Sequence, residues 1–419
     1  MLSRIILFSV MIFGFLLPIS TKYSNAALIL FYTLSIFYSI SYGFKFKDVK
    51  FRFVKGSTLL LFAPALISIL TFNDIEADFQ IISRRITFLI SPIVFLLLPN
   101  SIIEKIKFKS LFGLIIGCLT TSLYLIYKVL IKYYHSKNGF VIDKDLFNYY
   151  HTNVHFMSDI DIHPSYFGMF ILLSLFALWF LKPIKNHWFV SATYMIFGLA
   201  VLFINSRIII VFTVVFMVFI GYSMLKSYIK SFKHVFVIVL VGIAIFGSLF
   251  FFLKNTYLSQ RFSKELAWEL SNEIGTKYNS KNYGDSRVAR WRLAIELIKD
   301  KPFFGYGVSK ETIILKNAFL ENNMATSAKL QYNAHNQFIT TSLESGIIGL
   351  LILLYFFTYN LCIAFTKHDS LFLFYIISIL SICLIESYFK RNAGITFVSF
   401  FTTLLLLYNQ QNETITKSS

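Results

Sequence analysis

Long apolar runs dominate the chain, and short polar or basic gaps separate them. The apolar residues are continuous within each run and do not alternate with polar ones, which predicts membrane-spanning helices and argues against a transmembrane β-barrel. A helical span needs about 20 residues, with some allowance for tilt. Twelve runs qualify, at about 5–21, 24–43, 57–72, 79–99, 111–134, 164–182, 187–205, 207–225, 234–253, 338–366, 371–389 and 394–408. The pattern predicts an all-α polytopic membrane protein with about 12 transmembrane helices.

The largest gap separates the ninth run from the tenth and divides the chain into three expected parts. Residues 1–253 carry transmembrane helices 1–9. Residues 254–337 form one large periplasmic loop, expected to fold as helices packed on the bundle. Residues 338–419 carry helices 10–12 and a short cytoplasmic tail. The first run resembles a signal peptide, but no A-x-A-like cleavage site follows it, so we expect a retained span.

Composition excludes a water-soluble enzyme. The 419 residues are 56% hydrophobic and only 14% charged, whereas a soluble domain has about 25% charged residues. The formal charge of +18 does not indicate nucleic-acid binding, because most lysines lie in the short gaps between apolar runs. The three cysteines lie inside apolar runs and have neither disulfide-framework nor metal-site spacing.

The lysines set the expected orientation in the membrane. If all twelve runs span, four lysine-bearing gaps fall on the same side. These gaps contain residues 45–55, Lys105 to Lys109, Lys182 with Lys185, and Lys226 to Lys233. The positive-inside rule makes that side the cytoplasm and places both termini there.

The arginines follow a different distribution. Only Arg4 and Arg52 fall on the expected cytoplasmic side, and the other eight of the ten fall outside or at outer span ends. Topology alone favours basic residues inside, so a ligand is a better reason for the outer ones. Arginine is the side chain suited to bidentate binding of phosphate or carboxylate. The distribution indicates an anionic ligand at the outer leaflet.

Three arginines stand out at the ends of apolar runs. Arg84 and Arg85 interrupt the fourth run, where charge is costly. Their long side chains either extend to the outer interface of the membrane, or they line a cavity and bind an anion there. Arg207 is the single charge in residues 188–225 and follows Asn205 and Ser206. It marks either an ordinary hairpin tip or, as we favour, a ligand contact.

Residues 284–307 predict a helix that ends before Pro302. Asp285 or Ser286 can cap its start. Helical spacing places Arg287, Trp291, Ile295 and Ile298 on one face, expected to pack on the membrane domain. Arg290 and Arg292 then face water or headgroups. The sequence from Gly305 to Gly307 predicts a tight turn and not a nucleotide loop, because no βαβ context surrounds it.

Two histidines lie at expected outer ends of spans. His335, with Asn336, precedes the run that contains Glu344. Its imidazole can accept a proton from a hydroxyl group, or it can be a hydrogen-bonded interface residue. His163 opens the sixth run, where a simple helix start is the alternative.

Two further groups of residues carry weaker signals. Glu386 and Lys390 have i, i+4 spacing, which favours an ion pair. Tyr149, Tyr150, His151 and His155 form an aromatic and polar loop that could meet a sugar.

Three of these motifs, taken in order, resemble the O-antigen ligase family, which also contains related O-antigen polymerases. They are SR at 206–207, SRVARW with GYG at 286–307, and NAHN with ESGIIG at 333–349. The similarity is strongest over about 200–350. The resemblance implies a metal-independent membrane glycosyltransferase with no cofactor. Such an enzyme takes a glycan from an undecaprenyl-pyrophosphate carrier on the periplasmic side of the bacterial inner membrane.

The resemblance also assigns roles to residues. Arg207, Arg287 and His335 match the family's catalytic positions, whereas Arg84 and Arg85 match by position only. The arginines would bind the pyrophosphate, and His335 would activate the acceptor hydroxyl for one direct, inverting displacement. Residues of possible supporting function are His163, Trp291, Asn336 and Glu344.

Several functions remain open at this point. A ligase would use lipid A–core as acceptor, a polymerase a second lipid-linked repeat, and a third type of enzyme a protein. A transporter or flippase of a lipid-linked or anionic solute is the alternative from another class. It would predict broken helices or charges near the bilayer midplane and related halves of the chain, neither of which the sequence shows clearly.

Overall fold

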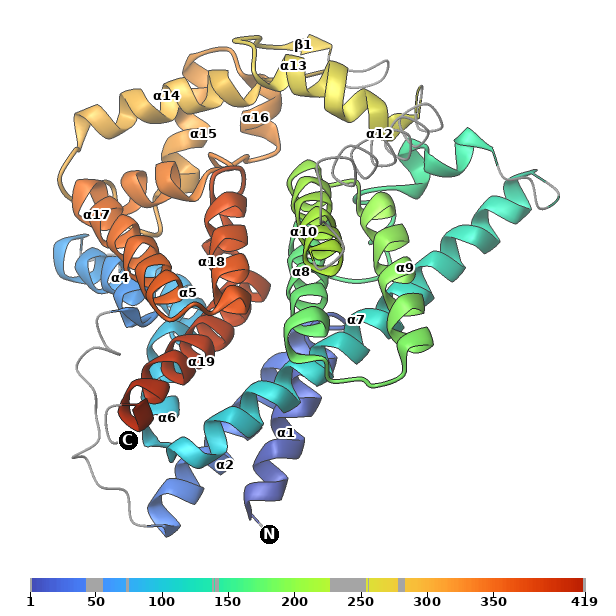
Figure 1. Ribbon diagram of the computed structural model, residues 1–419. Helices are drawn as coiled ribbons and strands as arrows, with labels where there is room; N and C mark the ends of the chain where they lie inside the picture. Colours follow the sequence, from blue (N-terminus) through green and yellow to red (C-terminus); the bar gives the residue numbers. More distant parts are fainter. Residues whose placement is uncertain are drawn as a thin grey trace. The chain divides into compact units, whose positions relative to one another are not determined.

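The structure is a computed structural model that describes residues 2–42, 56–72, 75–137, 139, 143–226, 254, 256–277 and 283–416. It forms two compact units (Figure 1). Unit 1 combines Met1–Gly117 with Ala267–Ser419, and unit 2 is Cys118–Leu266. The division cuts through α7 (Asn100–Lys137), so each unit is described by itself.

Apolar helices account for most of the described residues. Eight are long and apolar enough to cross a membrane, and three shorter apolar helices accompany them. These eleven helices coincide with eleven of the twelve predicted runs. The ninth run, 234–253, lies outside the described residues, as do the basic segment 45–55 and Lys230 and Lys233. The prediction of an all-α polytopic membrane protein is confirmed.

Unit 1 holds the amino-terminal and carboxyl-terminal helices. Its membrane-type helices are α1 (Leu2–Leu16), α2 (Thr21–Ser41), α4 (Leu59–Phe72), α5 (Ile75–Arg85), α6 (Thr87–Leu97), the first half of α7, α17 (Gln337–Thr366), α18 (Ser370–Cys383) and α19 (Asn392–Thr416). Helix α19 is largely buried among the others. Its Phe400 ring contacts those of Phe13, Phe31 and Phe95, with ring centroids 4.6 to 5.8 Å apart. This aromatic cluster joins four helices into one core.

Glycines allow α1 and α7 to pack closely. A Cβ at Gly14 would lie 2.2 Å from the Ser110 carbonyl oxygen, and one at Gly113 would lie 2.1 Å from that of Met11. Such small-residue contacts are a common means of helix association in membranes. Only glycine fits at these two positions.

The polar segment of unit 1 folds over one end of α17 and α18, as Figure 1 shows. It contains β1 (Thr276–Lys277), β2 (Tyr283–Gly284), α14 (Arg287–Asp300), α15 (Glu311–Glu321) and α16 (Ala325–Lys329). The two short strands pair antiparallel. Residues that include Ala294, Leu315, Phe319 and Met324 form a hydrophobic core together with Leu343 of α17. The expected packing of helices on the bundle is therefore observed here, with the addition of the small β-pair.

Unit 2 contains the second half of α7, η2 (Lys144–Phe147), η3 (Tyr149–His151), α8 (Pro164–Leu181), α9 (His187–Ile204), α10 (Arg207–Leu225), α12 (Tyr257–Gln260) and a π-helical turn, η4 (Arg261–Glu265). Helix α8 is buried over most of its length. A Cβ at Gly168 would lie 2.6 Å from the Ile209 side chain, so α8 and α10 pack tightly. The turn between α9 and α10 is held by Asn153, whose backbone N–H donates to the Phe203 carbonyl at 2.8 Å.

Helix α7 corrects one expected boundary. The predicted run starts near residue 111, but the helix starts at Asn100 and includes Lys105, Lys107 and Lys109. Its 38 residues extend about 57 Å at 1.5 Å per residue, against a hydrocarbon core of about 30 Å. The helix therefore reaches well beyond the apolar layer. Lys107 is buried, with its ammonium 3.1 Å from the centre of the Tyr408 ring.

Candidate active site

Helix α17 is broken nine residues after its start. Gly346 adopts φ 61° and ψ −155°, a region open almost only to glycine. The break frees backbone groups, and residues 302–307 bind them. Ile347 N–H donates to the Pro302 carbonyl at 2.7 Å, and Tyr306 and Gly307 N–H donate to Leu343 and Glu344 carbonyls at 2.7 and 2.9 Å. The predicted tight turn thus has a defined partner, the interrupted helix.

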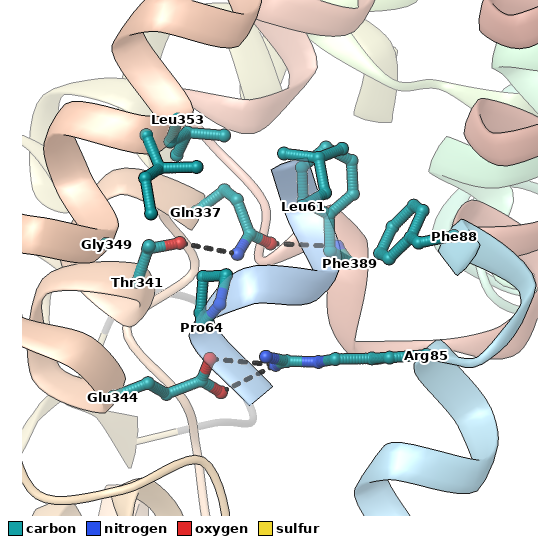
Figure 2. A pocket seen from close by; sticks show the side chains of 11 residues that line it. Leu61, Pro64, Arg85, Phe88, Gln337, Thr341, Glu344, Gly349, Leu353 and Phe389 are labelled. Atoms are coloured by element: carbon teal, nitrogen blue, oxygen red, sulfur yellow. Dashed lines mark hydrogen bonds and ion pairs between the residues drawn. The ribbon is translucent and has the colours of Figure 1, made fainter. Parts of the chain in front are cut away.

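A buried ion pair lies beside this break. One terminal nitrogen of Arg85 donates to both carboxylate oxygens of Glu344 at 2.8 Å, and both side chains are almost fully buried. Figure 2 shows Arg85 extending to Glu344 at a cavity that Gln337 also lines. The cavity measures about 20 Å³, room for about one water molecule. Arg85 is therefore charge-compensated by the protein itself, whereas Arg84 is exposed.

A second ion pair lies nearby and corrects a predicted one. The spacing of Glu386 and Lys390 favours a pair between them, but Lys390 pairs with Glu311 of α15. Helix α18 ends at Cys383, so helical spacing does not apply at Glu386. Burial lowers the pKa of Lys390, with Arg85 and Arg84 adding to the effect, while contact with Glu311 favours its charged form.

Glu386 contacts His335 instead. His335 Nδ1 lies 3.1 Å from Glu386 Oε2, and the two side chains are 26% and 15% exposed. His335 has φ 47°, and its N–H donates to Asn333 Oδ1 at 2.9 Å. Asn336 then caps α17, accepting from Phe338 and Ile339 N–H. The cap fixes the backbone on which the imidazole sits.

Arg287 reaches the residue next to Glu386. Ser286 caps α14 as predicted, accepting from Ala289 N–H at 3.2 Å. From the first turn, Arg287 Nη1 donates to the Ile385 carbonyl at 2.8 Å, and its Nε lies 3.5 Å from Glu269 Oε2. Farther along α14, Trp291 Nε1 donates to the Ala334 carbonyl at 2.6 Å. Arg287 and His335 are thus held on consecutive residues, Ile385 and Glu386.

The expected faces of α14 are partly wrong. Arg290, predicted to face water, is buried, with its guanidinium 4.9 Å from the centre of the Tyr332 ring. Burial lowers the pKa of Arg290 to about 10, with Arg287 contributing in the same direction. Ile295, predicted to pack inward, is 46% exposed. Ala289 and Ala294 pack inward in its place.

Arg207 lies in unit 2, where it starts α10 after Ser206. Its Nη1 donates to the Arg261 carbonyl at 3.3 Å, and Arg261 Nε lies 3.5 Å from Glu265 Oε2. Asn205, in the left-handed region at φ 48°, is fully buried in the turn. The predicted hairpin tip is therefore present, and the Arg207 side chain contacts the backbone of η4 there.

His163 also belongs to unit 2 and caps α8. Its Nδ1 accepts from Ser165 N–H at 3.4 Å, and Pro164 occupies the first turn. This is the helix start that the sequence offered as the alternative.

The described residues therefore bring most of the predicted site residues together in two groups within unit 1. Arg287, Trp291, His335 and Asn336 form the first, and Arg85 and Glu344, with Arg84 near Lys390, form the second. Arg207 and His163 lie in unit 2. Within these described ranges, no group of three or more His, Cys, Asp or Glu side chains is placed to hold a metal ion.

Sequence reasoning missed Glu311 and Lys390 as a pair and Glu386 as the partner of His335. The only signal for Glu386 was a carboxylate inside an otherwise apolar run, because its partner lies 51 residues away.

Comparison with known proteins agrees with the motifs. No curated protein matches the chain. A family model described as O-antigen ligase matches residues 192–354, which include most of α9, all of α10 and α14 to α16, and the broken part of α17. Arg207, Arg287 and His335 all fall within this stretch. Over this stretch, the chain is similar to the O-antigen ligase family.

Proposed function

We propose that the chain is a membrane glycosyltransferase that moves a glycan from an undecaprenyl-pyrophosphate carrier to an acceptor hydroxyl. Lipid A–core is the proposed acceptor, on the periplasmic side of the bacterial inner membrane, which makes the reaction a step of lipopolysaccharide biosynthesis. The observation that carries the proposal is the convergence of Arg287 and His335 on Ile385 and Glu386. A proton acceptor and an anion-binding group are thereby held at one place.

His335 is the proposed general base. Glu386 accepts a hydrogen bond from Nδ1–H in the tautomer that leaves Nε2 as the acceptor nitrogen. The carboxylate also stabilises the imidazolium that forms when His335 takes a proton. Glu386 is thus a positioning residue that acts through His335.

Arg287 is the proposed ligand for the leaving group. A guanidinium has five N–H donors, and the short bond to Ile385 uses one of them. The contact with Glu269, at 3.5 Å, is loose. A bound pyrophosphate, with more charge than one carboxylate, competes well for such a group. Arg207 is proposed to serve the same ligand, and the exposed Arg84 to attract it.

The chemistry balances with these groups alone. The acceptor oxygen attacks the anomeric carbon as its proton passes to His335 Nε2. The bond between that carbon and the pyrophosphate oxygen breaks, and the electron pair leaves with the carrier pyrophosphate. Charge growing on that oxygen is stabilised by the arginines. One displacement from the opposite face inverts the anomeric centre.

A reconstituted transfer assay tests the proposal. Purified protein in liposomes receives undecaprenyl-pyrophosphate glycan and either lipid A–core or a second lipid-linked repeat, with chelator present. Glycan on lipid A–core supports the ligase, and a lengthening ladder on the carrier would make the chain a polymerase. H335A and R287A should each lower the rate of transfer at least about a hundredfold, whereas R292A, an exposed arginine of the same helix, should retain it. Full transfer by H335A or R287A would refute the site.

A further inference from the structure

Unit 2 contains an open groove that the proposed chemistry does not use. It lies between the second half of α7 and residues 150–159, with a volume of about 330 Å³. Leu125, Val129 and Phe156 are buried and form an apolar floor. Its polar lining is exposed and consists of Lys128, Lys132, Tyr150, His155, Ser158 and Asp159. The volume is at the lower end of the range typical of small-molecule sites, about 300 to 1,000 Å³.

The lining offers both hydrogen-bond donors and acceptors. Lys128 Nζ lies 3.2 Å from Asp159 Oδ2, and Lys132 Nζ donates to the Tyr150 carbonyl at 3.3 Å. The hydrogen bond from Lys128 lowers the pKa of Asp159, which keeps the carboxylate as an acceptor. Both ammonium groups therefore already have oxygen partners. A phosphate, which only accepts, would meet an ionised carboxylate at the rim.

Aromatic rings form one side of the groove. The Tyr150 and His155 rings lie 5.9 Å apart, and Tyr149 supports His155 at 4.8 Å. Tyr150 is 48% exposed, so part of its side chain is accessible to a ligand. A pyranose has an apolar C–H face and a rim of hydroxyl groups that both donate and accept. Its apolar face suits a tyrosine ring, and its hydroxyls suit a mixed rim of ammonium, carboxylate and hydroxyl groups.

We propose that the groove bordered by Tyr150, His155, Lys128 and Asp159 binds one or two neutral sugar units of a glycan. The inference deepens the proposed function, since it adds a saccharide subsite outside the residues assigned to transfer. Binding there can be measured without turnover, so the two proposals can fail separately.

The test uses full-length protein in a detergent without a sugar headgroup. Methyl glycosides of glucose, galactose and N-acetylglucosamine are titrated by saturation-transfer NMR. At least one should bind in the millimolar range. Y150A and D159N should each raise its Kd about fivefold or more. Y127A, an exposed tyrosine of α7 outside the groove, is the matched control and should leave Kd unchanged.

Three outcomes would overturn the subsite. These are no binding of any of the three glycosides, equal binding by Y150A and D159N, or displacement of the glycoside by inorganic phosphate. The last would assign the groove to an anion. R287A should bind the glycoside as the wild type does while losing transfer. A wild-type protein that binds glycoside through Tyr150 but transfers nothing would refute the proposed function and leave the subsite standing.

Discussion

Replacement of Glu386 by glutamine tests the most specific feature of the proposed mechanism. The change keeps the size of the side chain and removes the charge that lies 3.1 Å from His335 Nδ1. A glutamine amide can also donate to Nδ1, which would favour the wrong imidazole tautomer. We expect kcat to fall and KM for donor and acceptor to stay unchanged, because Glu386 is proposed to act on His335 and not on either substrate.

The geometry sets the size of the effect. Two unit charges about 4 Å apart interact by about 1 kcal/mol in water and about 4 kcal/mol at the effective dielectric near a protein surface. His335 and Glu386 are 26% and 15% exposed, so solvent screens part of the attraction. An intermediate value of about 2 kcal/mol corresponds to a loss of about 30-fold in kcat.

Initial rates of transfer in liposomes provide the measurement. E296Q, at an exposed glutamate of α14, is the matched control and should keep the wild-type rate. The combination of E386Q with H335A separates positioning from a structural role. If Glu386 acts through His335, E386Q should cost nothing more once the imidazole is gone. A further loss of about 30-fold in the H335A background would refute the reasoning.

Three other perturbations follow from the structure. G346A places a methyl group 2.2 Å from the Phe303 carbonyl oxygen at φ 61°, and should destabilise by about 3 kcal/mol in thermal unfolding; G198A, with open space around it, should not. R85A leaves Glu344 buried without a partner and should cost about 3 to 5 kcal/mol, while the double change R85M/E344L should recover most of the loss; no recovery would contradict the pairing. Burial lowers the pKa of His151 below 6.5, because the folded protein favours the neutral imidazole. The contribution of neutral His151 to stability is therefore present above about pH 6.5 and is lost as pH falls through the pKa of the folded state. The protection factors of amides in the surrounding loop, which are corrected for the intrinsic pH dependence of hydrogen exchange, should therefore fall in that window, and H151Q should abolish this fall.

The sequence predicted the helices well, because continuous apolar stretches of spanning length have few other uses. Local capping rules also apply, as at Ser286, where the accepting hydroxyl and the donating Ala289 N–H are three residues apart. The expected start of α7 near residue 111 is wrong, because the lysines from Lys105 to Lys109 lie within the helix and not in a gap before it. A helix can continue through a basic segment once it leaves the apolar layer.

Side-chain partnerships were far less predictable. Arg85 and Glu344 are 259 residues apart, so neither position indicates the other. Arg290 is buried because Tyr332, from a distant segment, covers it. Glu386 was assigned to Lys390 on helical spacing, which fails where the helix has already ended. In each case the chemistry of the residue was evident and its partner was not.

The broken helix bears on the alternative of a transporter. No such break is evident from the residue pattern, yet α17 has one at Gly346, beside a buried ion pair. In transporters, a break of this kind exposes backbone groups to a solute. Here the chain's own residues 302–307 bind the freed groups. The break is therefore used for internal packing within this part of unit 1.

That arrangement has a consequence for biogenesis. A segment entering a bilayer with open backbone groups is penalised until they find partners. Residues 302–307 precede α17 in the chain, so the ribosome completes them before the segment that needs them. The 302–307 turn is therefore synthesised before α17, and the freed backbone groups of α17 can form their hydrogen bonds with it as soon as the helix emerges. If the 302–307 turn came later in the chain, the freed backbone groups of the nascent α17 would lack partners until the turn was synthesised. The incomplete helix would then be open to quality-control proteases.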